Sequence, residues 1–321
     1  MHCLVTGAAG FIGSQLAERL ASDGHEVRGV DCITDYYDVK QKQANLDAVR
    51  DAGIEVLVED LRDCDVDRLL DGVDVVFHLA GQPGVRASWG DQFADYLSIN
   101  VAATQRLLEA ARRTKLERFV IASSSSVYGE APRYPTTEEM LPAPVSPYGV
   151  SKLAAEQLSR AYAHNWGIPT VALRYFTVYG PRQRPDMGIH RFLRAIADGT
   201  PITVWGTGEQ IRDFTYVGDV VAATVAAGTR PVESGTILNV AGGSSVSVNE
   251  LIELIERTTG RTASVERTDP QPGDVTVTGG STERARQVLG WSPATTLADG
   301  VAAEWEWLRS GSGCAAASPG G

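Results

Sequence analysis

Near its N-terminus the chain carries three glycines at every third position, in the stretch Val5-Thr6-Gly7-Ala8-Ala9-Gly10-Phe11-Ile12-Gly13. The apolar pair Leu4 and Val5 is typical of a short strand, and the apolar residues after the glycines recur at helical spacing. We therefore predict a helix over Ala9–Asp23. A glycine-rich turn between a strand and a helix lets the backbone approach a pyrophosphate and lets the helix pack closely on the strand.

An acidic residue stands where such a unit would bind a ribose. Asp31 follows Glu26–Val30, which predicts the second strand, and no arginine comes directly after it. Its carboxylate could accept hydrogen bonds from adenosine ribose hydroxyls and would repel a 2′-phosphate. Gly7, Gly10, Gly13 and Asp31 therefore predict binding of NAD in preference to NADP. Asp60 ends the third predicted strand, where it either reaches the adenine amino group or serves as a solvated loop acid or helix cap.

The first half of the chain alternates strands with helices. Apolar runs predict further strands at Ile54–Val58, Val73–Leu79, Arg118–Ala122 and Val171–Tyr175, and helical spacing predicts a long helix over Phe93–Arg113. Such alternation is typical of a parallel sheet covered by helices on both faces. The expected fold is therefore α/β, with a Rossmann-type doubly wound parallel sheet.

After about residue 178 this alternation loosens. Short strands are expected at 203–204, 213–216, 238–241 and 264–266, and helices at 189–198, 219–227, 248–258, 282–289 and 297–308. We expect an NAD-binding domain over 1–177, including the catalytic helix. Residues 178–309 would form mainly a smaller mixed α/β substrate domain, with segments that return to the first. The Gly-, Ser- and Ala-rich tail 310–321 is expected to be disordered.

Composition narrows the class of protein. Hydrophobic residues make up 43% and charged residues 21%, as in an ordinary globular chain, and the formal charge of −11 argues against nucleic-acid binding. No signal peptide or membrane span is apparent. The cysteines, Cys3, Cys32, Cys64 and Cys314, lack metal-binding spacing and are expected to be reduced thiols in a cytoplasmic protein without a metal site.

Two side chains four residues apart suggest the chemistry. Tyr148 and Lys152 would share one face of a helix. An ammonium and a cationic nicotinamide beside a phenol would favour the phenolate and lower its pKa, and Lys152 could also bind the nicotinamide ribose. Such a pair is also common on the surface of an amphipathic helix. The serines that follow Arg118–Ala122 favour the catalytic interpretation, because they would lie at the carboxyl end of the sheet, although capping serines are the alternative.

These motifs resemble the extended short-chain dehydrogenase/reductase family of nucleotide-sugar enzymes, and Arg212-Asp213-Phe214 adds to the resemblance. The resemblance covers about residues 1–309 and implies that Ser124, Tyr148 and Lys152 form a catalytic triad. Asn100 matches an asparagine that steadies the site or the cofactor. The resemblance also implies cofactor contacts from Phe11, Ile12, Leu61, Leu79 and Ala80.

The family contains 4-epimerases, dehydratases, decarboxylases and reductases. Its dehydratases carry Thr-Asp-Glu where this chain has Ser124, Ser125 and Ser126, and its decarboxylases usually carry a glutamate at the third position. Because the acids for a second step are missing, the resemblance implies simple return of the hydride to the other face of a 4-keto sugar.

Two further stretches, Pro83–Trp89 and Tyr175–Met187, resemble the UDP-glucuronate 4-epimerases. This resemblance implies that Ser125, Ser126, Thr177 and Arg184 surround the C6 carboxylate of the sugar. The alternative is that Arg182 and Arg184 merely cap a loop or pair with Asp186. Weaker matches assign the diphosphate to Arg86, Arg191 and Arg212, and the uridine ribose to Asp274.

The leading hypothesis is therefore NAD-dependent epimerisation of UDP-glucuronate to UDP-galacturonate. A UDP-glucose or UDP-N-acetylglucosamine 4-epimerase is the first alternative, and a UDP-glucuronate decarboxylase the second. A non-catalytic NAD-binding regulator would tend to have lost Tyr148 or Lys152. The family often dimerises through two helices per subunit, which implies a homodimer formed by Phe93–Arg113 and Ser146–Asn165.

Overall fold

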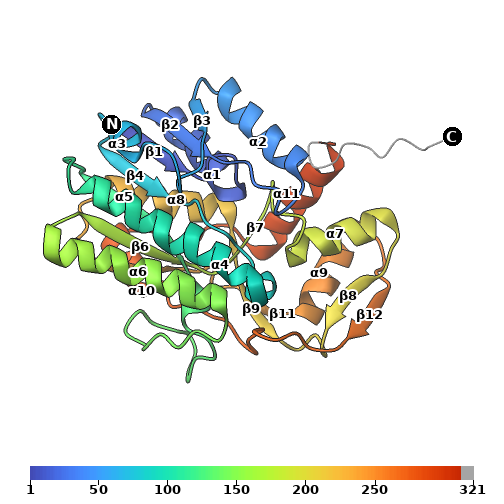
Figure 1. Ribbon diagram of the computed structural model, residues 1–321. Helices are drawn as coiled ribbons and strands as arrows, with labels where there is room; N and C mark the ends of the chain where they lie inside the picture. The colour runs from blue at the N-terminus through green and yellow to red at the C-terminus, as the bar shows by residue number, and fades with distance from the viewer. Residues whose placement is uncertain (312–321) are drawn as a thin grey trace.

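A sheet of seven strands forms the centre of the computed structural model, which describes residues 1–311 (Figure 1). Neighbouring strands are parallel throughout, in the order β10-β6-β5-β4-β1-β2-β3. The strands are β1 (His2–Thr6), β2 (Glu26–Asp31), β3 (Glu55–Val58), β4 (Val75–His78), β5 (Arg118–Ser124), β6 (Thr170–Tyr175) and β10 (Thr236–Val240). The predicted doubly wound parallel sheet is confirmed.

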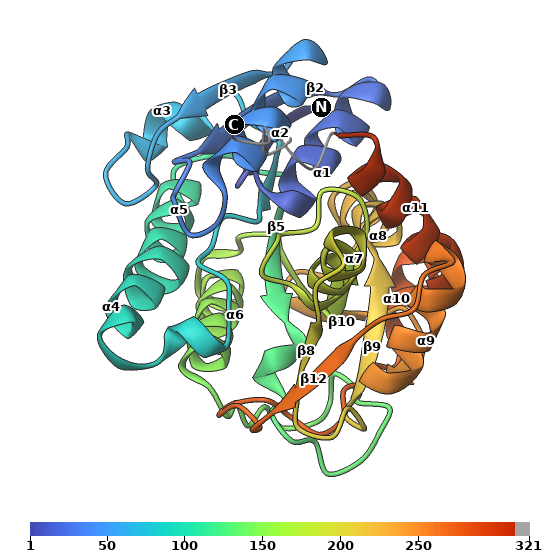
Figure 2. The ribbon, with the colours of Figure 1, turned by 90° about the vertical axis from the view of Figure 1, so that its right-hand side faces the viewer.

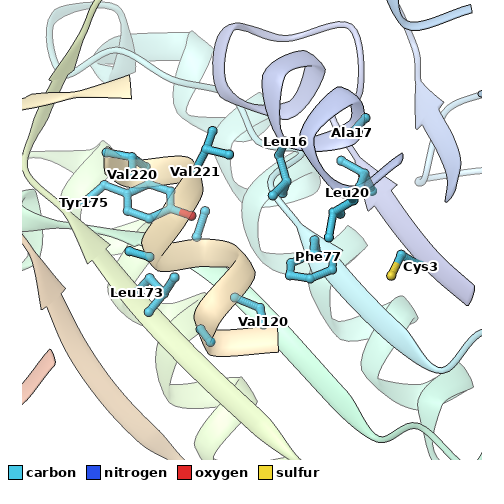
Figure 3. Close-up of a cluster of buried hydrophobic side chains, with 14 of the residues drawn as sticks. Cys3, Leu16, Ala17, Leu20, Phe77, Val120, Leu173, Tyr175, Val220 and Val221 are labelled. Atoms are coloured by element: carbon cyan, nitrogen blue, oxygen red, sulfur yellow. The ribbon is translucent and has the colours of Figure 1, made fainter. Parts of the chain in front are cut away.

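Helices bury both faces of this sheet. One face is covered by α1 (Phe11–Ser22), α2 (Val39–Asp51), α8 (Val217–Thr229) and α10 (Glu283–Leu289), and the other by α3 (Val66–Leu70), α5 (Ala103–Ala111) and α6 (Pro147–Trp166). Alternate residues of a strand enter the two cores, so that Val75 and Phe77 face the first and Val76 the second. Figure 3 shows side chains of α1 and α8 gathered over the sheet.

A smaller part of the molecule holds the remaining strands (Figures 1 and 2). One three-stranded sheet joins β11 (Ser245–Ser247), β9 (Ile211–Tyr216) and β7 (Thr177–Tyr179), and a parallel pair joins β12 (Val265–Thr268) to β8 (Ile202–Trp205). They pack with α7 (Gly188–Asp198), α9 (Val248–Thr259) and α11 (Leu297–Arg309) around a core that includes Phe192, Leu251 and Trp305. This part corresponds to the mixed α/β region expected after residue 178.

Several elements of the second half lie with the large sheet. Strand β10 pairs with β6, and α8 packs on α1 and β5. Both β10 and α8 follow residue 178, in the part of the chain that was expected to form mainly the smaller domain. A parallel edge strand and its covering helix require only apolar residues on the buried sides, so their sequences do not indicate which sheet they join. These are segments that return to the first half of the chain in space.

Two helices of the first half, α2 and α3, were not predicted, and one predicted continuous helix is divided into three segments. The buried face of α2 includes Lys42 and Asn45 beside Leu46 and Val49, so its apolar periodicity is weak. Helix α3 has only 5 residues, too few to show a helical periodicity. The helix predicted over Phe93–Arg113 consists of α4 (Phe93–Tyr96), a π-helical segment (Leu97–Ala102) and α5. A π-helical insertion is often found at a functional site, and this one contains Asn100.

Within residues 1–311, each helix is too short or too polar to cross a bilayer. Cys3, Cys32 and Cys64 are free thiols. Cys314 and the expected disordered tail, from residue 312 onward, lie outside the described residues.

Candidate active site

A cavity of about 430 Å³ runs along the carboxyl ends of the central strands. The strand order reverses between β1 and β4, which is where doubly wound sheets bind their ligands. Most residues predicted for the site line this cavity, although they come from distant parts of the chain. They are Gly7, Gly10, Phe11, Ile12, Gly13, Asp31, Asp60, Leu61, Leu79, Ala80, Ser124, Ser125, Ser126, Tyr148, Lys152, Thr177 and Arg184.

The glycine turn leaves no room for side chains. Gly7 has a φ of +73°, and a Cβ there would lie 2.9 Å from the backbone nitrogen of Ala80. A Cβ on Gly13 would overlap the carbonyl oxygen of Gly7. Gly10 caps α1 without a side-chain hydrogen bond, so the first N–H groups of the helix stay available to a phosphate. The turn therefore fits a dinucleotide pyrophosphate.

Asp31 is held at the edge of this turn. Its Oδ2 accepts a hydrogen bond from the Ala9 N–H (3.0 Å), and its Oδ1 accepts one from the Ile33 N–H (2.9 Å). These two bonds fix the carboxylate and leave further lone pairs for ribose hydroxyls. Asp60 also lines the cavity but pairs with Arg62 at 2.7 Å, and the Arg62 hydrogen bonds lower the pKa of Asp60.

The loop after β2 supplies cavity residues that the sequence analysis missed. Tyr36 and Tyr37 line the cavity beside Lys42 of α2. Lys42 is only 6% exposed, and its Nζ donates to Thr34 Oγ1 (2.7 Å) and lies 4.7 Å from the Tyr37 ring centroid. Burial lowers the pKa of Lys42, and nearby Asp31 opposes this shift. No local pattern reveals this position, because the apolar periodicity of α2 is weak and Lys42 reaches the cavity only through the packing of that helix.

Helix α6 presents Tyr148 and Lys152 to the cavity. The helix begins where Ser146 Oγ accepts from the Gly149 N–H (3.1 Å), has Pro147 in its first turn and ends at Gly167 with a φ of +68°. These signals fix the helical register, so the two residues share a face as predicted. Ser124 ends β5 opposite them, and its Oγ accepts from the Ser126 N–H (3.1 Å).

Burial shifts the pKa values of Tyr148 and Lys152 in opposite directions. Burial raises the pKa of the Tyr148 phenol, while a hydrogen bond with Ser124 and the charge of Arg184 oppose the rise. Loss of hydration therefore outweighs the charge of Arg184 within the protein itself. The expectation of a lowered phenol pKa concerns a phenol beside a cationic nicotinamide, and it stays a prediction. Burial also lowers the pKa of Lys152 to about 8, against the opposing charge of Glu156.

Asn100 lies behind the cavity lining and holds one wall of it. Its Oδ1 accepts from the Gln82 N–H (2.7 Å), and its Nδ2 donates to the Gln82 carbonyl (3.0 Å) and to Ser151 Oγ (3.0 Å). The residue thus joins the wall segment at Gln82 to the helix that carries Tyr148 and Lys152. Its direct contacts fit the steadying role that the resemblance implied better than a cofactor contact.

The four residues predicted around a sugar carboxylate meet in the cavity. Ser125, Ser126, Thr177 and Arg184 all line it together with Tyr148. Arg184 nevertheless also forms the ion pair that was its alternative role, at 2.9 Å from Asp186.

Arg182 lies in the same loop but points elsewhere. Its Nη1 donates to Glu18 (2.9 Å) and to Ser14 (3.2 Å), both on α1. Arg182 therefore fastens the loop to the helix that follows the glycine turn and does not pair with Asp186, the partner that the sequence analysis considered.

The residues predicted for the diphosphate and uridine ribose form a separate cluster beyond the cavity lining. Arg86 pairs with Asp274 at 2.8 Å, and Arg86 and Arg191 lie 3.7 and 4.2 Å from the ring centroid of Trp205. Arg212 donates to the carbonyl of Ile211 (2.8 Å). Trp205, whose ring contacts Arg86 and Arg191, was not predicted to belong to the site.

Comparison with known proteins identifies the family. The model of the NAD-dependent epimerase/dehydratase family matches residues 3–241. The chain belongs to this family.

Relatives match the enzyme along nearly its whole length. A UDP-glucuronic acid 4-epimerase from Bacillus cereus, crystallised with UDP-glucuronic acid and NAD, superimposes with a TM-score of 0.94 at 40% identity, covering 97% of this chain and 99% of the other. MoeE5, crystallised with UDP-glucose and NAD, has a TM-score of 0.88 at 42% identity, with coverage of 97% and 99%. The uncharacterized UDP-glucose epimerase YtcB of Bacillus subtilis is 44% identical over 312 residues, or 97% of this chain and 98% of the relative.

The enzyme is therefore an NAD-dependent nucleotide-sugar 4-epimerase. The glycine turn, Asp31 and the cavity between them fit NAD as its cofactor.

Proposed function

We propose that the enzyme interconverts UDP-glucuronate and UDP-galacturonate through a 4-keto intermediate. One observation carries this choice: a guanidinium, that of Arg184, lines the same cavity as Tyr148 and the hydroxyl residues Ser125, Ser126 and Thr177. A planar cation with several hydroxyls around it is suited to a planar anion such as the C6 carboxylate. A neutral hexose would have no charged group to match Arg184.

The catalytic residues divide the proton chemistry among them. We propose that Tyr148 takes the proton of the sugar 4-hydroxyl and that Ser124 shares this proton through its hydrogen bond to the phenol. Burial lowers the pKa of Lys152 to about 8, and as an ammonium this side chain favours the phenolate. Bound NAD supplies the acceptor for the C4 hydride.

The absence of acids at two positions directs the second half of the reaction. Positions 125 and 126 are serines that line the cavity, so neither offers a carboxylate for eliminating water or assisting decarboxylation. The 4-keto sugar then turns within the cavity and receives the hydride on its other face. We propose that Thr177 and Arg184 hold the carboxylate while this happens.

A UDP-glucose 4-epimerase is the second candidate. It is supported by the name of the Bacillus subtilis relative and by the UDP-glucose bound to MoeE5. Product analysis by NMR after incubation with each UDP-sugar separates the candidates. We expect UDP-galacturonate from UDP-glucuronate. Turnover of UDP-glucose together with inactivity on UDP-glucuronate would reject the proposal in favour of the second candidate.

Replacing Arg184 tests the carboxylate contact. Losing a buried charge-assisted hydrogen bond costs about 2–4 kcal/mol when its partner is left unpaired. Arg184→Ala should therefore lower kcat/KM for UDP-glucuronate at least about 30-fold, and far less for UDP-glucose. NMR should also detect some UDP-pentose, because a carboxylate that is free to rotate can align with the 4-keto group and leave as carbon dioxide. Equal losses on both sugars would remove Arg184 as the carboxylate ligand.

We also propose a homodimer formed by α4, α5 and α6. These helices pack side by side, and each of the two predicted stretches exposes an apolar residue, Leu97 at 43% and Val150 at 45%. Light scattering should give twice the chain mass, and Val150→Glu should shift the protein towards the monomer. A monomeric wild type would contradict the proposal.

A further inference from the structure

Arg184 has an acidic partner, Asp186, that is not part of the cavity lining. Its Nε donates to Oδ1 of Asp186 (3.0 Å), and its Nη2 donates to Oδ2 (2.9 Å). Arg184 lines the cavity, whereas Asp186 lies outside the lining, and the side chain of Asp186 is the more exposed of the two, at 37% against 18%. The Asp186 carboxylate therefore binds the guanidinium without itself lining the cavity.

This pairing leaves one edge of the guanidinium for a ligand. A guanidinium carries five N–H donors in a planar fork, and Asp186 uses the edge formed by Nε and Nη2. The edge formed by Nη1 and the second N–H of Nη2 remains. A tight turn maintains the arrangement, because the Met187 N–H donates to the carbonyl of Arg184 (3.1 Å) and brings Asp186 back towards Arg184.

The loop itself is fixed independently of Asp186. Gln15 of α1 donates to the carbonyl of Pro181 (2.9 Å), and Gln41 of α2 donates to the carbonyls of Arg182 (2.8 Å) and Gln183 (3.0 Å). Changing Asp186 therefore alters the charge and orientation of Arg184 while these anchors keep the backbone in place.

We propose that Asp186 is a specificity-determining residue that acts through Arg184, an inference that rests on the proposed function. It holds the guanidinium in one plane and neutralises it when the cavity contains no anion. The negative charge of Asp186 also limits how strongly the sugar site prefers a carboxylate. The carboxylate of a bound uronate is attracted by the Arg184 guanidinium and repelled by Asp186, which binds the same guanidinium.

Asp186→Asn separates the effect of the negative charge of Asp186 from its role in holding the Arg184 guanidinium in place. The amide has nearly the same size and keeps one acceptor for Arg184, but it removes the negative charge. Because repulsion between like charges outweighs one lost hydrogen bond, the preference for the anionic sugar should increase. We expect the ratio of the Kd of UDP-glucose to the Kd of UDP-glucuronate, measured by calorimetry on the holoenzyme, to rise about 10-fold. A merely structural role would weaken the binding of both sugars and leave this ratio unchanged.

Two further variants serve as controls. Asp186→Glu keeps the charge and should keep the ratio near that of the wild type. Glu18→Gln removes the acidic partner of Arg182 in the same loop, away from the cavity, and should also leave the ratio unchanged.

A ratio in Asp186→Asn that is unchanged or lower would overturn the inference. So would an equal rise in Glu18→Gln, because the effect would then belong to the loop as a whole. The turnover assay tests the proposed function separately. A wild-type enzyme that binds UDP-glucuronate without epimerising it would contradict the proposed function, whereas the Kd ratio would still decide the role of Asp186.

Discussion

Tyr148→Phe is expected to lower the rate of epimerisation about 100-fold or more while the enzyme still binds NAD and the nucleotide sugar. The substitution keeps the ring, which lies edge-on to Tyr96 at a centroid distance of 6.2 Å, and removes only the ionisable hydroxyl. The variant therefore lacks the base that Ser124 positions, by a hydrogen bond, to take the proton of the sugar 4-hydroxyl. Turnover is measured by NMR at saturating substrate, and binding by calorimetry.

A second tyrosine on the same helix provides the control. The Tyr162 hydroxyl contacts Glu109 and Gln105 at the far end of α6, away from the cavity, so Tyr162→Phe should turn over at nearly the wild-type rate. If purified Tyr148→Phe does the same, Tyr148 is not the base.

Glu156→Ala is expected to lower the free energy of unfolding by about 3–5 kcal/mol. Glu156 lies one turn beyond Lys152 and is fully buried. Its carboxylate accepts from the Ser123 hydroxyl (2.7 Å) and from Nε (2.9 Å) and Nη2 (2.6 Å) of Arg174. Removing it would leave a buried guanidinium without a counter-charge, and such a loss is a large part of the roughly 5–15 kcal/mol that stabilises a typical domain.

Urea unfolding measures this change, with two comparisons. Glu253→Ala breaks the exposed pair with Arg257 and should have little effect on the urea midpoint. The double variant Glu156→Leu/Arg174→Met should recover much of the loss, because apolar residues of similar size replace both charges. A loss below about 1 kcal/mol in Glu156→Ala would show that Arg174 finds another partner or water.

The parts of the site that depend on short-range geometry were predictable. Gly7, Gly10 and Gly13 lie within one strand–turn–helix unit. Their spacing follows from steric requirements inside that unit, which do not depend on how the rest of the chain packs. Tyr148 and Lys152 share a helical face through their spacing alone. The serines after Arg118–Ala122 were placed near them because the carboxyl ends of parallel strands meet at one edge of the sheet, whereas the choice of Ser124 came from the family resemblance. Ser124, Tyr148 and Lys152 all line one cavity.

Other features arose only from the packing of distant segments. Lys42 reaches the cavity because α2 packs beside the glycine turn, and Trp205 gathers Arg86 and Arg191 from two different helical segments. Strand β10 joins the large sheet at the edge next to β6, which no local pattern specifies. These contacts join residues far apart in the chain, so their spacing in the sequence carries no information about them.

By itself, the sequence determined the class of fold, the dinucleotide turn, the acidic residue beside it and the shared helical face of Tyr148 and Lys152, because each depends on local spacing and on the common edge of a parallel sheet. The family resemblance of its motifs added Ser124 to this pair. Only the tertiary structure decided the electrostatics. Burial raises the pKa of Tyr148 and lowers that of Lys152 to about 8, and folding sets Asp186 against one edge of Arg184. The physical reason is that desolvation and Coulomb interactions depend on every neighbour in space, whichever segment of the chain supplies it.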